Sequence, residues 1–112
     1  MLNQETIDVI SQKIAQSYRR AFGDALQDIL LYGSCARGDY DGESDIDYAA
    51  IVKGERSALK KKLKAVWQDA ADIGLEYDIM VSPTMIPAAD YEKYKDGLPY
   101  YRNIHREGKR IV

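Results

Sequence analysis

The spacing of apolar residues predicts two amphipathic helices. Across residues 5–22, apolar side chains recur every three or four positions, the pattern of a helix with one buried face: Ile7, Ile10, Ile14, Tyr18 and Phe22. Thr6 is the candidate N-cap. Residues 55–73 repeat the pattern, with Gly74 at the place of a C-terminal cap, and their apolar stripe is Ala58, Leu59, Leu63, Val66, Trp67, Ala70 and Ile73. We expect both helices to cover the core, with Trp67 inside.

Three further segments have the patterns of strands. Residues 27–32 are almost continuously apolar, which is typical of a central strand buried on both faces. Residues 44–52 form the second predicted strand, which ends in the apolar run at residues 49–52. Residues 75–82 alternate, so that one face is apolar and the other contains Glu76 and Asp78. A carboxylate in the middle of an otherwise apolar strand is costly to bury without a partner or a metal ion.

The end of the chain is less regular. Short helices are predicted at residues 87–94, with Pro87 in the first turn, and at residues 99–107. Ile111 and Val112 follow as a terminal strand or a frayed end.

A small-residue turn follows the strand at residues 27–32. Gly33 permits close approach of a ligand to the backbone, and the N–H and hydroxyl groups of Ser34 can bind a phosphate oxygen. Arg37 lies near this turn if the segment is helical, where it can neutralise phosphate charge or pair with local acids. Gly-Ser pairs are also ordinary turns, so this feature needs support from elsewhere in the chain.

Three carboxylates supply that support. Asp45 and Asp47 are two residues apart on one predicted strand, so both point to the same face, and Asp78 comes from another strand. Converging carboxylates suit Mg²⁺ and a two-metal displacement at phosphorus. Asp45 and Asp47 are then the candidate ligands of the metals that bind a triphosphate. Asp78 would ligate the metal of the attacking hydroxyl and help to remove its proton.

A calcium loop is the rival interpretation of the acidic run at residues 39–45. An EF-hand requires glycine at loop position six and glutamate at position twelve. Counted from Asp39, these positions hold Ser44 and Ala50, and counted from Asp41 they hold Ile46 and Val52. Neither register fits, and we reject the calcium loop.

Composition narrows the functional classes. The chain of 112 residues has the length of one domain, which we take as residues 1–112, and its net charge of −2 gives no support to a nucleic-acid partner. The single cysteine, Cys35, excludes an internal disulfide and suits a packing role. No secretory signal and no membrane-spanning run is evident, so we expect a cytoplasmic protein without a membrane partner.

The motif set resembles a known family. Gly33-Ser34-Cys35-Ala36-Arg37-Gly38, then Ser44-Asp45-Ile46-Asp47 and later Asp78, is similar to the GSxARG…DxD…D pattern of the minimal nucleotidyltransferase family, in the DNA polymerase β-like superfamily. The resemblance covers essentially the whole chain. It implies an α/β fold with a small mixed sheet flanked by helices. It also implies phosphate binding at Gly33 and Ser34, and Mg²⁺ binding, with two ions, and catalysis at Asp45, Asp47 and Asp78.

The resemblance further implies a biological setting. Such proteins commonly act as MntA-like antitoxins that transfer AMP from ATP to a tyrosine of a HEPN-domain toxin, within homo- or hetero-oligomers. One alternative is an antitoxin that blocks its toxin by occlusion alone. Another is a nucleotidyltransferase that acts on a small molecule, for which this chain offers no second, acceptor-binding domain.

Some residues have two open interpretations. Four tyrosines after Pro83 fit either a partner contact or closure of the core beneath the sheet: Tyr91, Tyr94, Tyr100 and Tyr101. His105, the only histidine, fits the surface or ordinary packing. Four lysines fit a solvated helix face better than a basic patch for an anionic partner: Lys60, Lys61, Lys62 and Lys64.

Overall fold

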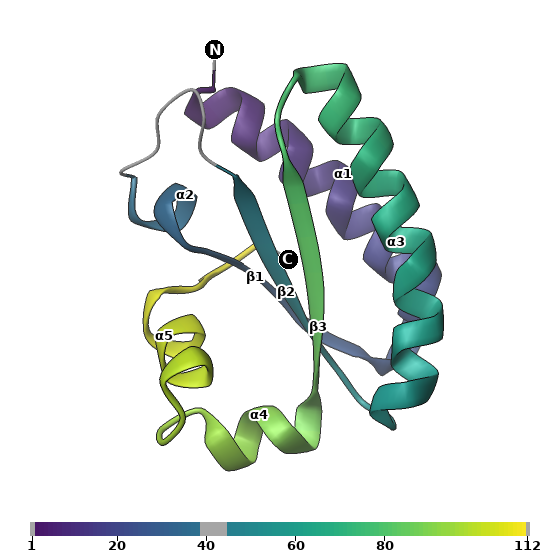
Figure 1. Ribbon diagram of the computed structural model, residues 1–112, viewed down its shortest axis with the longest axis vertical. Helices are drawn as coiled ribbons and strands as arrows, with labels where there is room; N and C mark the ends of the chain where they lie inside the picture. Colours follow the sequence, from purple (N-terminus) through teal and green to yellow (C-terminus); the bar gives the residue numbers. More distant parts are fainter. Residues whose placement is uncertain (1, 39–44, 112) are drawn as a thin grey trace.

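The computed structural model describes residues 2–38 and 45–111, which form a four-stranded mixed sheet flanked by helices (Figure 1). The strand order is β3-β2-β1-β4. The central strand β2, Ile46–Val52, is antiparallel to β1, Leu26–Tyr32, and parallel to β3, Val81–Pro87. A two-residue strand β4, Lys109–Arg110, pairs antiparallel with the other edge of β1. This arrangement confirms the predicted fold class.

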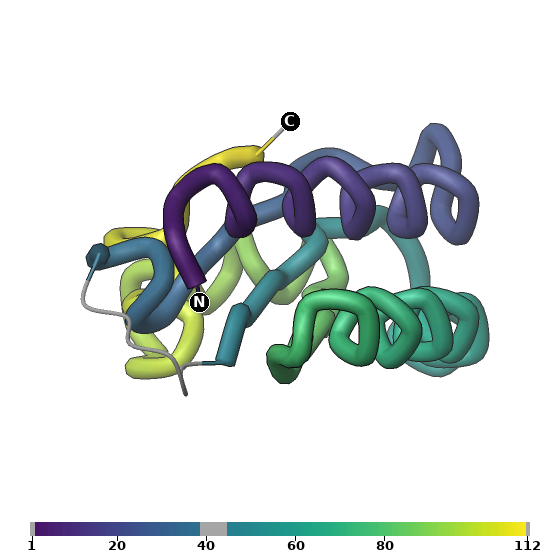
Figure 2. Tube along the Cα trace, turned by 90° about the horizontal axis from the view of Figure 1, so that it is seen from above, coloured from purple at the N-terminus to yellow at the C-terminus, as the bar shows by residue number. Residues whose placement is uncertain are grey.

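Helices α1, Gln4–Phe22, and α3, Arg56–Tyr77, cover one face of the sheet and run side by side (Figures 1 and 2). Their apolar stripes bury the main core against alternate residues of the strands, among them Ile29, Leu31, Tyr48 and Ala50. Tyr48 on β2 also exchanges a buried hydrogen bond with Ser11 on α1, with 2.7 Å between the two hydroxyl oxygens. Apolar burial and this polar contact fix α1 on the sheet.

The opposite face of the sheet is covered by two short helices, α4, Ala88–Tyr94, and α5, Pro99–Glu107. Ile104 of α5 packs in a second core cluster with Leu30, Ala49, Ile51 and Ile86. Both helices were predicted from the sequence. Tyr91 and Tyr101 pack against this cluster, which confirms core closure for these two, whereas Tyr100 is 49% exposed.

The end of α3 differs from the prediction. The helix continues past Gly74 to Tyr77, and Asp78 follows as its C-cap in a left-handed conformation with φ 55°. Gly74 is needed for another reason, because the chain folds back and a Cβ there would lie 2.6 Å from the carbonyl oxygen of Ile79. Asp78 therefore caps a helix and does not lie on a strand, and β3 begins three residues later. The predicted strand at 75–82 was wrong for residues 75–80, and only Val81 and Ser82 lie on β3.

Smaller corrections concern helix capping and burial. Asn3 caps α1, because its side chain accepts a hydrogen bond from the N–H of Thr6, the residue that the sequence suggested as the cap. Trp67 is 49% exposed and does not lie in the core. Glu76 lies near the end of α3 and forms an ion pair with Lys13 of α1 at 3.1 Å. No helix of the described chain has the length and apolar character needed to cross a bilayer.

Candidate active site

The turn after β1 is tight because Gly33 has a conformation that other residues avoid, with φ 77° and ψ −157°. Its carbonyl oxygen accepts hydrogen bonds from the N–H groups of Ala36 and Arg37 at 3.1 and 3.3 Å, and this starts the short helix α2, Ser34–Arg37. The cap residue of α2 is Gly33 rather than Ser34, and no side chain makes a capping bond. Gly38, in the left-handed region, ends the helix. We call Gly33 and Ser34 the Gly-Ser turn.

Asp47 is the second residue of β2, and Asp45 directly precedes the strand. The cross-strand partner of Asp47 is Tyr32, the residue before the Gly-Ser turn. Asp47 is half-buried and belongs to the face of the sheet that α4 and α5 cover, since Ala49 and Ile51 on that face belong to the second core cluster. Asp45 is exposed. Burial raises the pKa of Asp47, and the neighbouring charge of Asp45 raises it further. A divalent cation bound to Asp47 would offset both the burial of its charge and the repulsion from Asp45.

The turn and the carboxylate are in direct contact. A Cβ atom built on Gly33 would lie only 2.9 Å from Oδ2 of Asp47. Glycine at position 33 is therefore favoured for two reasons: its backbone angles strain other residues, and a side chain there would displace the Asp47 carboxylate. The structure thus brings together Gly33 and Asp47, which the sequence placed 14 positions apart.

Two tyrosines border the carboxylates on the side of α5. Tyr32 is the cross-strand partner of Asp47, and its hydroxyl lies 3.4 Å from that of Tyr100, with the two rings edge to face. Burial raises the pKa of Tyr32, and Tyr100 and the Asp47 charge add to this effect. The Tyr32 phenol therefore stays protonated at neutral pH beside the site. The sequence motifs did not indicate Tyr32, although its position directly before the Gly-Ser turn is such a signal.

Cys35 is buried in the main core next to the backbone of Asp45. Its side chain is 3% exposed and Sγ is 3.4 Å from the carbonyl oxygen of Asp45. Burial raises the pKa of this thiol, and the charges of Asp47 and Asp45 act in the same direction. The thiol therefore packs and does not act as a nucleophile, as the sequence suggested.

Arg37 connects α2 to the far end of α5. Its guanidinium forms an ion pair with Glu107 at 3.1 Å, and both side chains are a little under half exposed. The sequence suggested that Arg37 neutralises phosphate charge or pairs with local acids. The structure shows an ion pair, and the acid comes from α5. His105 is exposed, and its Nδ1 lies 2.8 Å from the hydroxyl of Tyr91 on α4, which agrees with a surface role.

Asp78 stands apart from the other two carboxylates. It lies at the end of α3, and in the described part of the chain no three acidic, histidine or cysteine side chains are grouped to hold a metal ion. The residue beside Asp47 on β3 is Ser82. Residues 39–44, with the rest of the acidic run and Ser44, lie outside the described residues.

Comparisons with known proteins place this geometry in context. The nucleotidyltransferase domain family matches residues 11–111. "Putative protein adenylyltransferase MJ0141" of Methanocaldococcus jannaschii is 40% identical over 79 residues, which cover 70% of this chain and 77% of that protein. A second protein of this organism, "Putative protein adenylyltransferase MJ1305", is 27% identical over 80% of this chain and 60% of its own length.

Solved structures agree on the fold. The crystal structure of a toxin–antitoxin with AMP-PNP superposes with a TM-score of 0.58 at 21% identity, covering 91% of this chain and 72% of that one. A mutant of the toxin–antitoxin MntA–HpeT gives 0.57 at 20% identity, with the same coverage. The domain match extends over nearly the whole chain and includes the Gly-Ser turn and all three carboxylates. The chain therefore belongs to the nucleotidyltransferase domain family, and its enzyme class is that of a nucleotidyltransferase.

Proposed function

We propose that this chain transfers AMP from ATP to a tyrosine hydroxyl of a partner protein, and that the partner is a HEPN-domain toxin that the chain neutralises as an antitoxin. The observation that supports it most is the contact between the Gly-Ser turn and Asp47. It places a candidate phosphate-binding backbone directly beside a pair of crowded carboxylates. Relatives named as protein adenylyltransferases, and a structural neighbour described as a toxin–antitoxin with AMP-PNP, support the nucleotide and the kind of acceptor.

The carboxylates fit Mg²⁺. Asp45 and Asp47 offer hard oxygen ligands two residues apart. Burial and the charge of Asp45 raise the pKa of Asp47, and a bound cation would offset both. Mg²⁺ bound here would neutralise phosphate charge and favour displacement at phosphorus. Asp78 is our proposed third carboxylate, from the sequence motif and from its position just before β3, the neighbour of β2. This role is tested separately below.

In the proposed reaction, a bond forms between the tyrosine oxygen and the α-phosphorus, and the bond from that phosphorus to the bridging oxygen of the β-phosphate breaks. Pyrophosphate leaves, and a carboxylate takes the phenolic proton. The backbone of Gly33 and the N–H and hydroxyl groups of Ser34 would hold the departing phosphates. Arg37 would contribute positive charge at the same end. We place this reaction in the cytoplasm, where ATP is available.

The test is an incubation with ATP labelled in the α-phosphate, Mg²⁺ and the product of the adjacent gene. We expect label on a tyrosine of that protein with the wild type, none without Mg²⁺, and none with Asp47→Ala. Equal labelling by wild type and Asp47→Ala, or none by either, would count against the proposal.

The variant Asp78→Asn tests whether the third carboxylate takes part in catalysis. A loss of labelling as complete as that of Asp47→Ala supports its catalytic role, and unchanged labelling excludes it. Full protection from the toxin by an Asp45→Ala/Asp47→Ala double variant would favour occlusion.

A further inference from the structure

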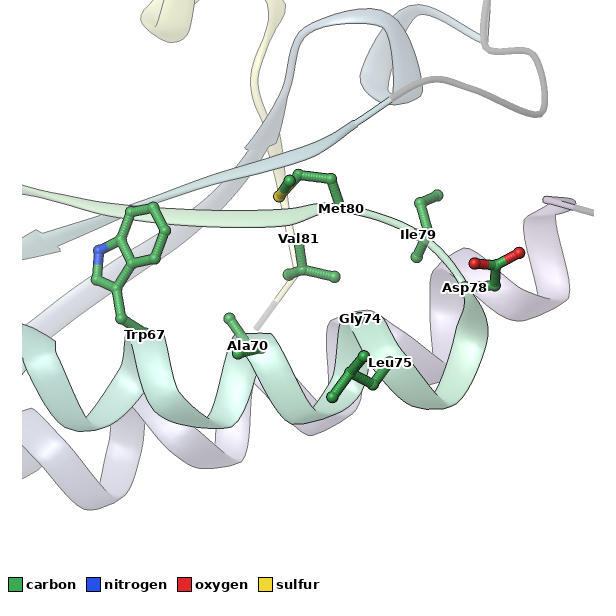
Figure 3. Close-up of a pocket in the computed structure, with 9 residues that line it drawn as sticks. Trp67, Ala70, Gly74, Leu75, Asp78, Ile79, Met80 and Val81 are labelled. Carbon is green, nitrogen blue, oxygen red and sulfur yellow. The ribbon is translucent and has the colours of Figure 1, made fainter.

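An apolar groove lies between the last turns of α3 and the start of β3 (Figure 3). Its volume is about 530 Å³, within the range of small-ligand and side-chain pockets. Three large apolar side chains at the groove are exposed, Trp67 by 49%, Leu75 by 84% and Met80 by 60%. The remaining lining residues are Ala70, Ala71, Gly74, Asp78, Ile79 and Val81. Exposed apolar residues gathered in this way are typical of a contact surface.

The groove adjoins the proposed active site. The carbonyl oxygen of Met80 accepts a hydrogen bond from the N–H of Ile46 at 2.9 Å, and Ile46 is the residue between Asp45 and Asp47. Among the described residues that line the groove, Asp78 is the only acid. An occupant of the groove therefore lies at the same end of the sheet as the carboxylates.

The direction of the reaction favours an acceptor there. In the strand order β3-β2-β1, the Gly-Ser turn follows β1 on one side of the β2 carboxylates, and the groove adjoins β3 on the other side. Displacement at phosphorus requires the attacking oxygen to lie opposite the leaving group. If the leaving phosphates lie at the Gly-Ser turn, the attacking hydroxyl comes from the side of β3. The groove lies on the α3 side of the sheet and Asp47 belongs to the opposite face, so a segment docked in the groove must pass the start of β3 to reach the phosphorus.

The charge around the groove indicates the kind of partner. Lys60 and Lys64 precede Trp67 by seven and three positions, so they lie on the same side of α3 as Trp67, and both are exposed. The three acids of α3 lie on its α1 side: Asp69 pairs with Arg20 and Glu76 with Lys13, both on α1, and Asp72 lines a hollow with Lys13 and Arg20. This side of α3 is thus basic at one end and apolar at the other, and it complements a segment with both acidic and aromatic residues.

We propose that this groove binds the acceptor protein through an acidic segment that contains the reactive tyrosine, with its apolar neighbours on Trp67, Leu75 and Met80. The proposal rests on the proposed function for the step that follows docking. In that step the tyrosine oxygen bonds to the α-phosphorus, pyrophosphate leaves and the phenolic proton passes to a carboxylate. Docking itself requires neither ATP nor Mg²⁺.

The single tryptophan makes docking measurable, because all indole fluorescence comes from Trp67. The probe is a random copolymer of glutamate and tyrosine, added without nucleotide or metal. Polyglutamate and a copolymer of lysine and tyrosine are the controls. We expect a saturable blue shift with the glutamate–tyrosine copolymer, a smaller one with polyglutamate and none with the lysine–tyrosine copolymer. Equal responses to all three, or no response, would overturn the proposal.

Surface variants then locate the contact. Leu75→Ser and Met80→Ser keep the charge and should each weaken binding about fivefold or more. Lys60→Glu with Lys64→Glu should weaken it further and reduce its salt dependence. Val9→Ser on α1, where Val9 is 41% exposed, is the matched control and should bind as the wild type does. Equal weakening by Val9→Ser, or none by Leu75→Ser and Met80→Ser, would exclude the groove.

The failure of this inference can be distinguished from the failure of the proposed function. Saturable binding with no AMP transfer leaves the groove intact and rejects the chemistry. AMP transfer to the adjacent gene product at wild-type rates by Leu75→Ser and Met80→Ser rejects the groove and leaves the chemistry intact. If the emission of the protein alone changes on dilution, the occupant is a second copy of the chain and the proposal is wrong.

Discussion

At the scale of single residues, Gly33 is the residue of the Gly-Ser turn that lies against the Asp47 carboxylate. We expect Gly33→Ala to destabilise the protein by about 1–3 kcal/mol through backbone strain and also to displace Asp47, whose Oδ2 would lie 2.9 Å from the new Cβ. Activity should therefore fall far more than stability explains. Gly38→Ala is the matched control, because Gly38 also has positive φ, 81°, but a Cβ there meets no atom of the described residues within 4 Å. Urea unfolding and AMP transfer measure both variants, and equal loss of activity would contradict the contact.

The raised pKa of Asp47 predicts how the stability of the protein depends on pH. Because burial and Asp45 raise the pKa of Asp47 in the folded state, the folded protein holds this proton more tightly than the unfolded chain does. In the presence of a chelator, stability should therefore fall as the pH rises from the ordinary aspartate pKa through the raised one. Asp47→Asn should lack this component and be more stable than the wild type at neutral pH.

Mg²⁺ provides the control for this effect. It should stabilise the wild type at neutral pH by binding the folded state, and it should stabilise Asp47→Asn much less. Asp24→Asn, which removes an exposed carboxylate in the turn after α1, should keep the wild-type response to both pH and Mg²⁺. Thermal unfolding across the acidic range measures all three proteins. Identical pH profiles for wild type and Asp47→Asn would refute the assignment.

At the scale of elements, the hydrogen bond between Ser11 and Tyr48 positions α1 against β2. Both side chains are buried and their hydroxyl oxygens are 2.7 Å apart, so Tyr48→Phe leaves the Ser11 hydroxyl without its partner. We expect Tyr48→Phe to cost about 1–3 kcal/mol. Adding Ser11→Ala should recover part of the loss, because the double variant buries no unpaired hydroxyl. Urea unfolding of the four proteins gives the coupling energy, with Tyr100→Phe at the surface as control, and strictly additive losses would show that the bond contributes nothing.

The junction of α3 and β3 shows where sequence patterns stop being sufficient. The alternation Leu75, Tyr77, Ile79, Val81 predicted a strand, but Leu75 and Tyr77 belong to the last turn of α3. Gly74 resembled a helix end, yet it is required by the approach of the Ile79 carbonyl, a tertiary contact that no local pattern reveals. The same contact moves Asp78 from a strand to a helix cap.

The sequence likewise placed some residues of the site and the groove correctly and others wrongly. The Gly-Ser turn and the Asp45–Asp47 pair depend on local order along the chain, so the sequence was enough to place Gly33, Asp45 and Asp47 together. Trp67 shows the limit of the helical pattern. With Ala71 and Leu75 it forms a second apolar stripe beside the buried one, and the core has room for only one of the two. A helix with more apolar surface than its core can cover is a signal of a contact surface.

At the scale of the whole molecule, the sheet separates two proposed binding functions. Ser34 lies beyond β1, Leu75 borders the groove at β3, and β2 with its carboxylates lies between them. Since neither side chain shares a partner with the other, their effects on transfer should be independent. Ser34→Ala should raise the KM for ATP about tenfold, through one lost hydrogen bond to a charged phosphate. Leu75→Ser should raise the KM for the acceptor about fivefold and leave that for ATP unchanged.

The double variant Ser34→Ala/Leu75→Ser tests this separation. Independent sites predict that kcat/KM falls by the product of the two single effects, to within about twofold. Steady-state AMP transfer, with each substrate varied in turn, gives all the constants, and Val9→Ser supplies the control for an apolar-to-serine change outside the groove. A double variant no slower than the slower single variant would mean that both residues serve one step. ATP and the acceptor would then not occupy opposite sides of β2, and the in-line arrangement across the sheet would have to be abandoned.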